Sequence, residues 1–235
     1  MQHNPFVLIA ISIALAGFFI SNTLVNASLA QNTITVKGLA EQEVKADTAY
    51  WTIGTGLKTT DDTISTEYLY EQYDKKVQTI YKTLLELEFS KDEIEIDVAE
   101  IRFEDLRDED NNLVETRRSL MGKINIITLD VDKVKSSRTS LNKLIAQGIT
   151  LTNFDPEYHF TRLNDIKPAM IKQATQNAKI AAQEFANNVD ATIAGIKTAS
   201  QGRFSIKDIG EDYYDTRKIN KKVRVVANVE YYLKN

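Results

Sequence analysis

The side chains of this sequence that could take part in catalysis are few. Its two histidines are His3, near the amino terminus, and His159. The chain has no cysteine, so it offers no thiolate nucleophile and no thiolate ligand for a metal. One usable histidine excludes a two-histidine zinc site and disfavours a serine–histidine–aspartate triad. Because His159 stands between Tyr158 and Phe160, we interpret it as an ordinary strand residue.

Carboxylates are numerous, with 33 aspartates and glutamates in the chain. Pairs such as Glu93 with Glu95, or Asp108 with Asp110, have the residue type that a glycosidase uses as acid and base. Spacing in sequence does not place them around a substrate, however. They support only an alternative hypothesis, that of a periplasmic hydrolase or small-ligand enzyme whose carboxylates meet in the fold.

An acidic stretch from Asp108 to Asn112 is similar to the beginning of a calcium-binding loop. An EF-hand would have glycine where Leu113 stands and a bidentate glutamate where Ser119 stands. The stretch is therefore predicted to be the solvated tip of a hairpin. We assign no catalytic, cofactor-binding or metal-binding residue, and the sequence implies no cofactor.

The tyrosines are the remaining residues whose distribution suggests a function. Tyr70 falls off the apolar stripe of the first predicted helix, whereas Tyr68 and Tyr73 fall on it. Partly exposed aromatic side chains favour protein interfaces, which predicts a homo-oligomer or an envelope protein partner. The alternative is that they pack between helix and sheet. The tyrosines concerned are Tyr68, Tyr70, Tyr73 and Tyr81 on that helix, and Tyr213, Tyr214, Tyr231 and Tyr232 near the carboxyl end.

The amino-terminal segment is apolar and carries no charged side chain before Lys37. Two interpretations remain open. Residues 6–25 could form an uncleaved inner-membrane anchor, since about 20 apolar residues cross the hydrocarbon core. Residues 1–30 could instead be a signal peptide cleaved after Ala30, with Ser28 and Ala30 as the small residues before the cleavage site. Both predict a periplasmic location for the rest of the chain.

The remaining part, residues 33–235, has the length of one domain and carries all of the net charge of −4. An acidic surface does not favour phosphate recognition, so nucleic-acid binding is excluded as a function class. A chain of this size buries enough surface to be stable without a disulfide or a metal.

Apolar periodicity predicts the elements that must position these side chains. Helices are expected over about 64–89, 132–147 and 165–189, with Thr60–Thr63 and Asp165 as amino-terminal caps and Gly148 as a carboxyl-terminal stop. Two glycines, Gly54 and Gly56, suggest a bulge or a close backbone approach within a strand. Strands are expected over 33–38, 43–57, 93–103, 113–131, 149–160 with a break at Asp155-Pro156, 193–206 and 221–233.

This order of strands and helices, with frequent hairpins, predicts an α+β fold. We expect a largely antiparallel sheet with helices packed on it. Each half of the chain has a strand, a helix and a following hairpin, which indicates a structural pseudo-repeat. The many alanines of the third helix, among them Ala174 and Ala178, predict that this helix packs closely on the sheet.

Three segments resemble the SIMPL-domain proteins of bacterial envelopes. They are ITVKGLAEQEVKADTAYWTIG from Ile34, IKPAMIKQATQNAKIAAQEFA from Ile166, and the carboxyl-terminal GRFSIKD with KKVRVVANVEYYL. The resemblance covers about Thr33–Leu233. It implies an α+β fold, export, oligomeric assembly and, in some members, protection against oxidative stress. It supplies no catalytic motif, so we expect a non-enzymatic envelope protein that acts through assembly or binding.

Overall fold

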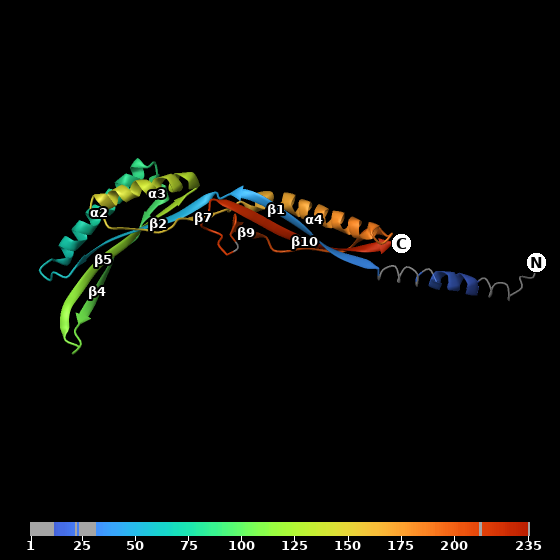
Figure 1. Ribbon diagram of the computed structural model, residues 1–235, viewed down its shortest axis with the longest axis horizontal. Coiled ribbons are helices and arrows are strands. Elements are labelled where there is room, and N and C mark those ends of the chain that lie inside the picture. Colours follow the sequence, from blue (N-terminus) through green and yellow to red (C-terminus); the bar gives the residue numbers. More distant parts are fainter. Residues whose placement is uncertain (1–11, 22, 24–31, 212, 235) are drawn as a thin grey trace, which may run out of the picture. The chain divides into compact units, whose positions relative to one another are not determined.

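The computed structural model describes residues 12–21, 23, 32–211 and 213–234, and the chain divides into two compact units (Figure 1). The first unit combines the chain up to Gln42 with Leu163–Ser205 and the chain from Val223. The second unit consists of Glu43–Arg162 and Ile206–Lys222. The predicted strand–helix–hairpin halves therefore do not correspond to the compact units, because both ends of the chain contribute to one of them.

Helices and antiparallel strands mix along the chain, as predicted. The helices are α2 (Thr66–Glu86), α3 (Val131–Ala146) and α4 (Leu163–Asn187), together with the 3₁₀ turn η1 (Lys91–Glu93) and a helical stretch at 12–21. The strands are β1 (Thr33–Lys45), β2 (Thr48–Thr59), β3 (Ile94–Ile96), β4 (Glu100–Arg107), β5 (Leu113–Thr128), β6 (Leu151–Asn153), β7 (Glu157–His159), β8 (Thr192–Gln201), β9 (Ser205–Asp208) and β10 (Asn220–Lys234).

These strands form two sheets rather than one. Sheet A has the order β1-β10-β8, with β9 paired to β10. Sheet B has the order β3-β5-β2-β6, with β4 also paired to β5 and β7 also paired to β2. The fold is thus α+β with two antiparallel sheets, which confirms the predicted fold class.

In the first unit, α4 covers one face of sheet A through small side chains (Figure 1). Ala174 and Ala178 are fully buried, and they face Gly38 of β1. A Cβ atom on Gly38 would lie 1.9 Å from the carbonyl oxygen of Ala174. The alanine-rich helix therefore packs closely on the sheet, as the sequence predicted. The alternating row of β10 completes this core with Val223, Val225, Ala227, Val229 and Tyr231.

In the second unit, α2 and α3 pack against the β2–β5 pair. The Ser65 hydroxyl caps α2 by accepting from the Tyr68 N–H at 3.1 Å, and the Asp130 carboxylate caps α3 by accepting from the Lys133 N–H at 3.0 Å. Gly148 ends α3 with a φ of 80°, as predicted. The core beneath both helices contains Trp51, Ile53, Val77, Ile80, Leu84, Leu120, Ile124, Ile126, Val134, Leu141 and Leu144.

The first two predicted strands have their break in the wrong place. Strand β1 continues to Lys45, and the chain turns at Ala46 and Asp47 instead of near Leu39. The Asp47 carboxylate fixes this turn, because it accepts hydrogen bonds from the N–H and hydroxyl of Thr161 at 3.0 and 2.8 Å and from the N–H of Arg162 at 3.2 Å. An aspartate with such partners stabilises a turn that apolar periodicity does not reveal.

Three details of the predicted helices are also wrong. Helix α2 begins after Ser65 rather than at Thr60–Thr63, and Leu69 takes the buried position that was expected for Tyr68. Helix α4 begins at Leu163 rather than after Asp165, so Pro168 lies inside it. The apolar stripe expected for α3 included Ile145, and the stripe expected for α4 included Ala181, Phe185 and Val189, but these side chains are partly or largely exposed.

The predicted apolar leader is described only in part. Residues 12–21 are helical. Residues 1–11, 22 and 24–31 lie outside the described residues, so the expected cleavage site at Ala30 and both ends of the expected anchor over 6–25 are not described. Among the residues that are described, none of the helices has the length and apolarity needed to cross a membrane.

Candidate functional site

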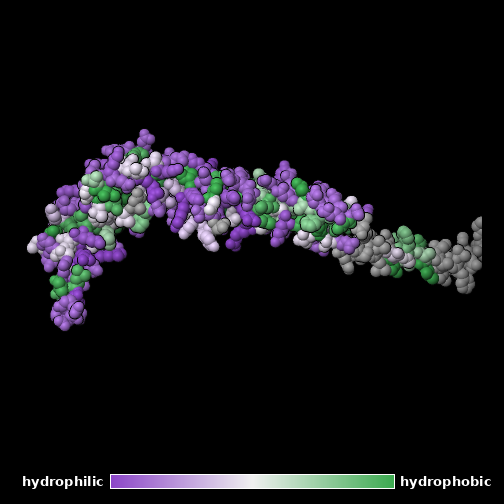
Figure 2. Space-filling view, in the orientation of Figure 1, coloured by the Kyte–Doolittle hydropathy of each residue, from purple (hydrophilic) through white to green (hydrophobic). Residues whose placement is uncertain are grey.

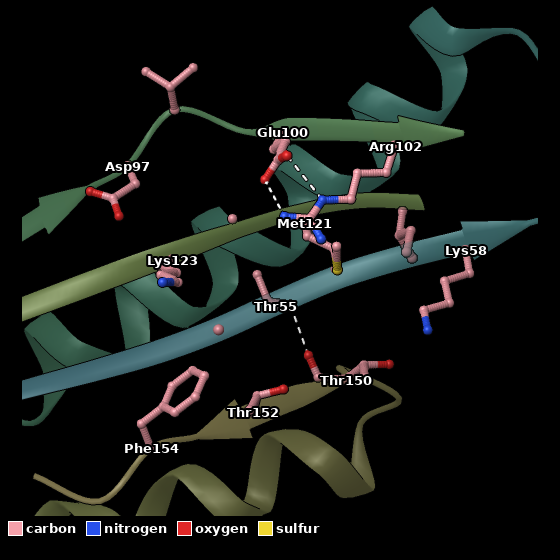
Figure 3. Close-up of a pocket in the computed structure, with 15 residues that line it drawn as sticks. Thr55, Lys58, Asp97, Glu100, Arg102, Met121, Lys123, Thr150, Thr152 and Phe154 are labelled. Atoms are coloured by element: carbon pink, nitrogen blue, oxygen red, sulfur yellow. Dashed lines mark hydrogen bonds and ion pairs between the residues drawn. The ribbon is translucent and has the colours of Figure 1, made fainter. Parts of the chain in front are cut away.

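A groove runs along the face of sheet B that carries no helix (Figure 3). Its floor is formed by Gly54 and Gly56 of β2 and by Met121 of β5, the residue that pairs with Gly56. Helix α2 covers the opposite face of the same strands. The groove has a volume of about 890 Å³, within the range of protein binding sites.

Gly54 leaves the floor without a side chain. A Cβ atom there would meet the Phe154 ring and the Thr152 Cβ at 3.4 Å, which is ordinary van der Waals contact. The sequence suggested a bulge or a close backbone approach at Gly54 and Gly56. The bulge is wrong, because β2 pairs with β5 without a register shift from Ala49 to Thr59. The close approach is confirmed at Gly56, where a Cβ atom would lie 2.7 Å from the Leu120 carbonyl oxygen.

Two walls flank this floor. Figure 3 shows Thr150, Thr152 and Phe154 along one side of β2, with the Thr55 hydroxyl donating to the Thr150 carbonyl oxygen at 2.8 Å. Asp97, Glu100 and Arg102 lie on the other side, beyond β5. Strand pairing brings these two sets together from segments some fifty residues apart in sequence.

Both carboxylates of the groove already have partners. The Arg102 guanidinium donates to both Glu100 oxygens, at 2.9 and 3.0 Å, and these hydrogen bonds, with the charge of Arg102, lower the pKa of Glu100. Asp97 accepts from the Asn125 amide at 3.0 Å, and the Asn125 oxygen accepts from the Thr52 hydroxyl at 2.9 Å. Neither carboxylate is held in an arrangement typical of a general acid or nucleophile.

The lysines of the groove have no such partners. The ammonium groups of Lys58 and Lys123 form no hydrogen bond or ion pair with any residue that the structure describes, and both side chains are exposed. Lys123 contributes only a longer-range attraction to Glu100. Phe154 and Met121 add apolar contact area, and the three cations Lys58, Arg102 and Lys123 outnumber the carboxylates of Asp97 and Glu100 by one positive charge.

Strand β2 also has an open edge beside the groove. Strand β6 pairs with β2 only from Ile53 to Thr55. From Gly56 to Thr59, β2 has no strand partner on that side within the described part of the chain. Backbone N–H and C=O groups on such an edge can pair with an extended polypeptide.

The predicted carboxylate pairs do not form sites. Glu93 accepts from the Ser90 N–H at 2.8 Å and from the Lys133 ammonium at 3.1 Å, while Glu95 is exposed on the other side of β3. Asp108 closes the β4–β5 loop by accepting from the Asp110 and Asn112 N–H groups at 3.0 and 2.8 Å. The hairpin tip is thereby confirmed. Over the described residues, no group of three histidine, aspartate or glutamate side chains could hold a metal.

His159 and the tyrosines lie at separate places. His159 is in β7 as predicted, 3.3 Å from a Glu157 oxygen and with its ring against Tyr50. Tyr70 is exposed, as predicted, but Tyr68 is exposed too, and Tyr73 is buried with its hydroxyl over Gly122. Tyr213 and Tyr214 are exposed, and Tyr231 is buried.

Sequence reasoning missed a buried ion pair in the second unit. Lys221 and Asp208 are both fully buried and in contact. The Lys221 ammonium also donates to the Asp215 carbonyl oxygen at 2.7 Å, and Asp208 accepts from the Arg217 and Lys218 N–H groups at 2.8 and 3.0 Å. This pair anchors the loop between β9 and β10. The Lys221 ammonium and both Asp208 oxygens are hydrogen-bonded within the fold, which is typical of a structural ion pair.

Comparison with known proteins identifies one family. The model of the SIMPL family, described as a protein of unknown function (DUF541), matches residues 34–229, which is most of the chain. A search of curated proteins finds no match to this chain. The matched span contains sheet B, most of sheet A, the groove and the Gly38–Ala174 contact. The chain belongs to the SIMPL family.

Proposed function

We propose that this protein is an exported, non-enzymatic binding protein of the bacterial envelope, and that the groove of sheet B captures an extended, acidic polypeptide segment. The observation that carries the proposal is the charge state of the groove. Its carboxylates are engaged by Arg102 and Asn125, whereas the ammonium groups of Lys58 and Lys123 are free to pair with a ligand.

The shape of the groove favours a polypeptide over a compact molecule. The groove follows the strand direction, is open to solvent, and borders the unpaired edge of β2 at Gly56–Thr59. A peptide could pair its backbone there and direct alternate side chains toward the groove face of the sheet, beside Gly56. Its acidic side chains would then lie near Lys58 and Lys123.

Export to the periplasm is supported by the apolar residues 6–25 and by the absence of cysteine. We retain both fates of the leader, an inner-membrane anchor or cleavage near Ala30. A contribution to oxidative or envelope stress tolerance rests on the resemblance to SIMPL-domain proteins. Capture of acidic segments of other exported chains would be a physical basis for such a role.

Fluorescence anisotropy tests the binding proposal. The full chain in a nonionic detergent should bind a labelled peptide of alternating Glu and Val more tightly than one of alternating Lys and Val. The affinity should fall as salt is added, because salt screens exposed charges. Equal affinity for both peptides would overturn the proposed ligand class.

Variants locate the binding site. Lys58→Gln and Lys123→Gln should each weaken binding of the Glu-Val peptide about two- to fivefold, the range of an exposed ion pair. Gly54→Ala should weaken it without loss of stability, because the added methyl group meets only ordinary contacts. Lys82→Gln, an exposed lysine of α2 outside the groove, is the matched control and should bind normally. A loss of affinity in the control alone would place binding elsewhere.

A further inference from the structure

Strand β4 is the outer strand of the β4–β5 hairpin. It pairs with β5 along one side, and no strand pairs with its other side in the described residues. A free edge of this length exposes a row of backbone N–H and C=O groups to other chains. Helix α2 packs over β2 and β5. It does not cover the β4 edge, as the 64% exposure of Phe103 shows, although this side chain points to the helix side of the sheet.

Several apolar residues near the tip of this hairpin are exposed, although they continue the row of the core. Ile101 and Phe103 share a face with Leu120, which is buried under α2. Beyond Leu120 the row continues uncovered, with Phe103 and Val114 accessible to solvent. Figure 2 shows hydrophobic residues on the hairpin just before its hydrophilic tip. A partner that covers Phe103 would bury this surface.

We propose that β4 pairs antiparallel with β4 of a second copy of this chain, about a two-fold axis at Phe103. The axis of such a pair is perpendicular to the sheet and leaves each side chain on its own face. A residue can therefore face its own equivalent only at the axis. This inference rests on the β4 edge and is independent of the ligand proposed for the groove.

Length and charge select the register. Strand β4 spans Glu100–Arg107, so the longest pairings are centred on Phe103 or on Glu104. The register centred on Glu104 brings two carboxylates together, which is destabilising. The register centred on Phe103 brings the two phenyl rings together and places Arg102 opposite Glu104 of the second copy. Directly facing residues in this register include no pair of like charges.

Contacts already present in the monomer support the same register. Arg102 is bound to Glu100, and Glu104 accepts from Arg117 at 3.1 Å, all on the groove face. Joining the two copies would produce a row of alternating charge, from Arg117 to Glu104 to Arg102 of the second copy. Since the axis preserves faces, both grooves would open on the same side of one continuous sheet.

Disulfide cross-linking tests the register, and the absence of cysteine makes each introduced thiol unique. Facing residues of antiparallel strands have Cβ atoms about 4.5–5.5 Å apart, close to disulfide geometry, whereas diagonal neighbours lie about 7–8 Å apart. Full-length Phe103→Cys in detergent should form a covalent dimer under mild oxidation. Tyr213→Cys, at a fully accessible position outside the hairpin, is the control.

A mixture of two variants makes the test specific. Arg102→Cys and Glu104→Cys should cross-link to each other when mixed, and much less when each is oxidised alone. Equal cross-linking of Phe103→Cys and Tyr213→Cys, or a mixture no better than its components, would overturn the proposal. Dimers that form only with unrelated proteins would overturn it as well.

Sedimentation velocity provides a test that needs no covalent bond. Phe103→Asp should shift the full chain toward the monomer, with an unchanged circular dichroism spectrum because Phe103 is largely exposed. Tyr70→Glu, on the exposed face of α2, should leave association unchanged. A wild-type chain that stays monomeric across a wide range of concentration in the same detergent would contradict the inference.

Discussion

Gly38 of β1 and Ala174 of α4 are in backbone contact: a Cβ atom on Gly38 would lie 1.9 Å from the Ala174 carbonyl oxygen and 2.3 Å from the Ala178 nitrogen. Both obstacles are main-chain atoms, which cannot rotate away as a side chain can. The helix and the strand therefore approach as closely as they do only because position 38 has no side chain. Gly38 and Ala174 lie in the first and second of the segments that resemble SIMPL-domain proteins.

We expect Gly38→Ala to destabilise the protein by about 1–3 kcal/mol or more, since overpacking of a tight core costs that much. Urea unfolding followed by circular dichroism measures the loss. The matched control is Gly195→Ala in β8 of the same sheet, where the new methyl group would meet nothing within 4 Å. If both variants unfold at the same urea concentration, the close packing of α4 on β1 is not a determinant of stability.

The buried pair of Lys221 and Asp208 gives a second prediction. Lys221→Met should destabilise the protein by about 3–5 kcal/mol, because it leaves the Asp208 carboxylate buried without a counterion. Lys218→Met removes a partly exposed ion pair with Glu211 and should cost about 1 kcal/mol or less. Thermal unfolding of both variants tests the contrast. Similar melting temperatures would mean that water reaches Asp208 in solution.

The carboxylate of Asp47 should make stability depend on pH. Burial raises its pKa, but hydrogen bonds from Thr161, Thr48 and Arg162 outweigh burial, so the pKa in the folded state lies below the ordinary value. A group with a lowered folded pKa binds more protons in the unfolded chain. Its stabilisation is complete above the unfolded pKa of about 4 and is lost as the pH falls through the folded pKa.

Glu93 should act in the same direction. Burial raises its pKa, and hydrogen bonds from Thr128, Ser90 and Lys133 lower it further than burial raises it.

The contribution of Asp47 is tested by urea unfolding at neutral pH and at successively lower pH. The wild type should lose stability more steeply than Asp47→Asn as the pH falls. Asp62→Asn is the control, because Asp62 is exposed and unbonded within the described part of the chain. Identical pH profiles of all three proteins would refute the assignment.

Location is the fourth prediction. A reporter fused after Asn235 should be active when its activity requires export and inactive when it requires the cytoplasm. The intact mass of the purified protein then separates the two fates of the leader, because cleavage near Ala30 gives a chain that begins at Gln31. Activity of a cytoplasm-only reporter would contradict the envelope location.

The sequence predicted helices and strands better than it predicted which residues of different strands contact one another. The strict alternation of Val223, Val225, Ala227 and Val229 was sufficient to identify β10 and its buried face. Lys221 belongs to the same alternating row and is buried, although a lysine at the end of a strand is normally expected to be exposed to solvent. Only its partner Asp208, which is separated from it by a loop, makes that burial possible.

The buried face of a helix was predicted less well where more than one apolar stripe was available. In α4 the alanines form more than one apolar stripe, and the bulky Phe185 suggested the wrong one. Packing against Gly38 selects the stripe with the smallest side chains instead. The groove could be anticipated only at Gly54 and Gly56, because Phe154 and Arg102 reach it through strand pairing that local patterns do not specify.

Because both ends of the chain contribute to the first unit, its strands are synthesised at very different times. Strand β1 leaves the ribosome first and its neighbour β10 last, roughly 10–40 s later at the usual rate of about 5–20 residues per second. Val36 and Ala40 have no cover from β10 during that interval, whereas Glu43–Arg162 is complete much earlier. A chain whose translation stops before Val223 therefore retains an unpaired first strand. The first unit can therefore form only after the chain has been made through β10.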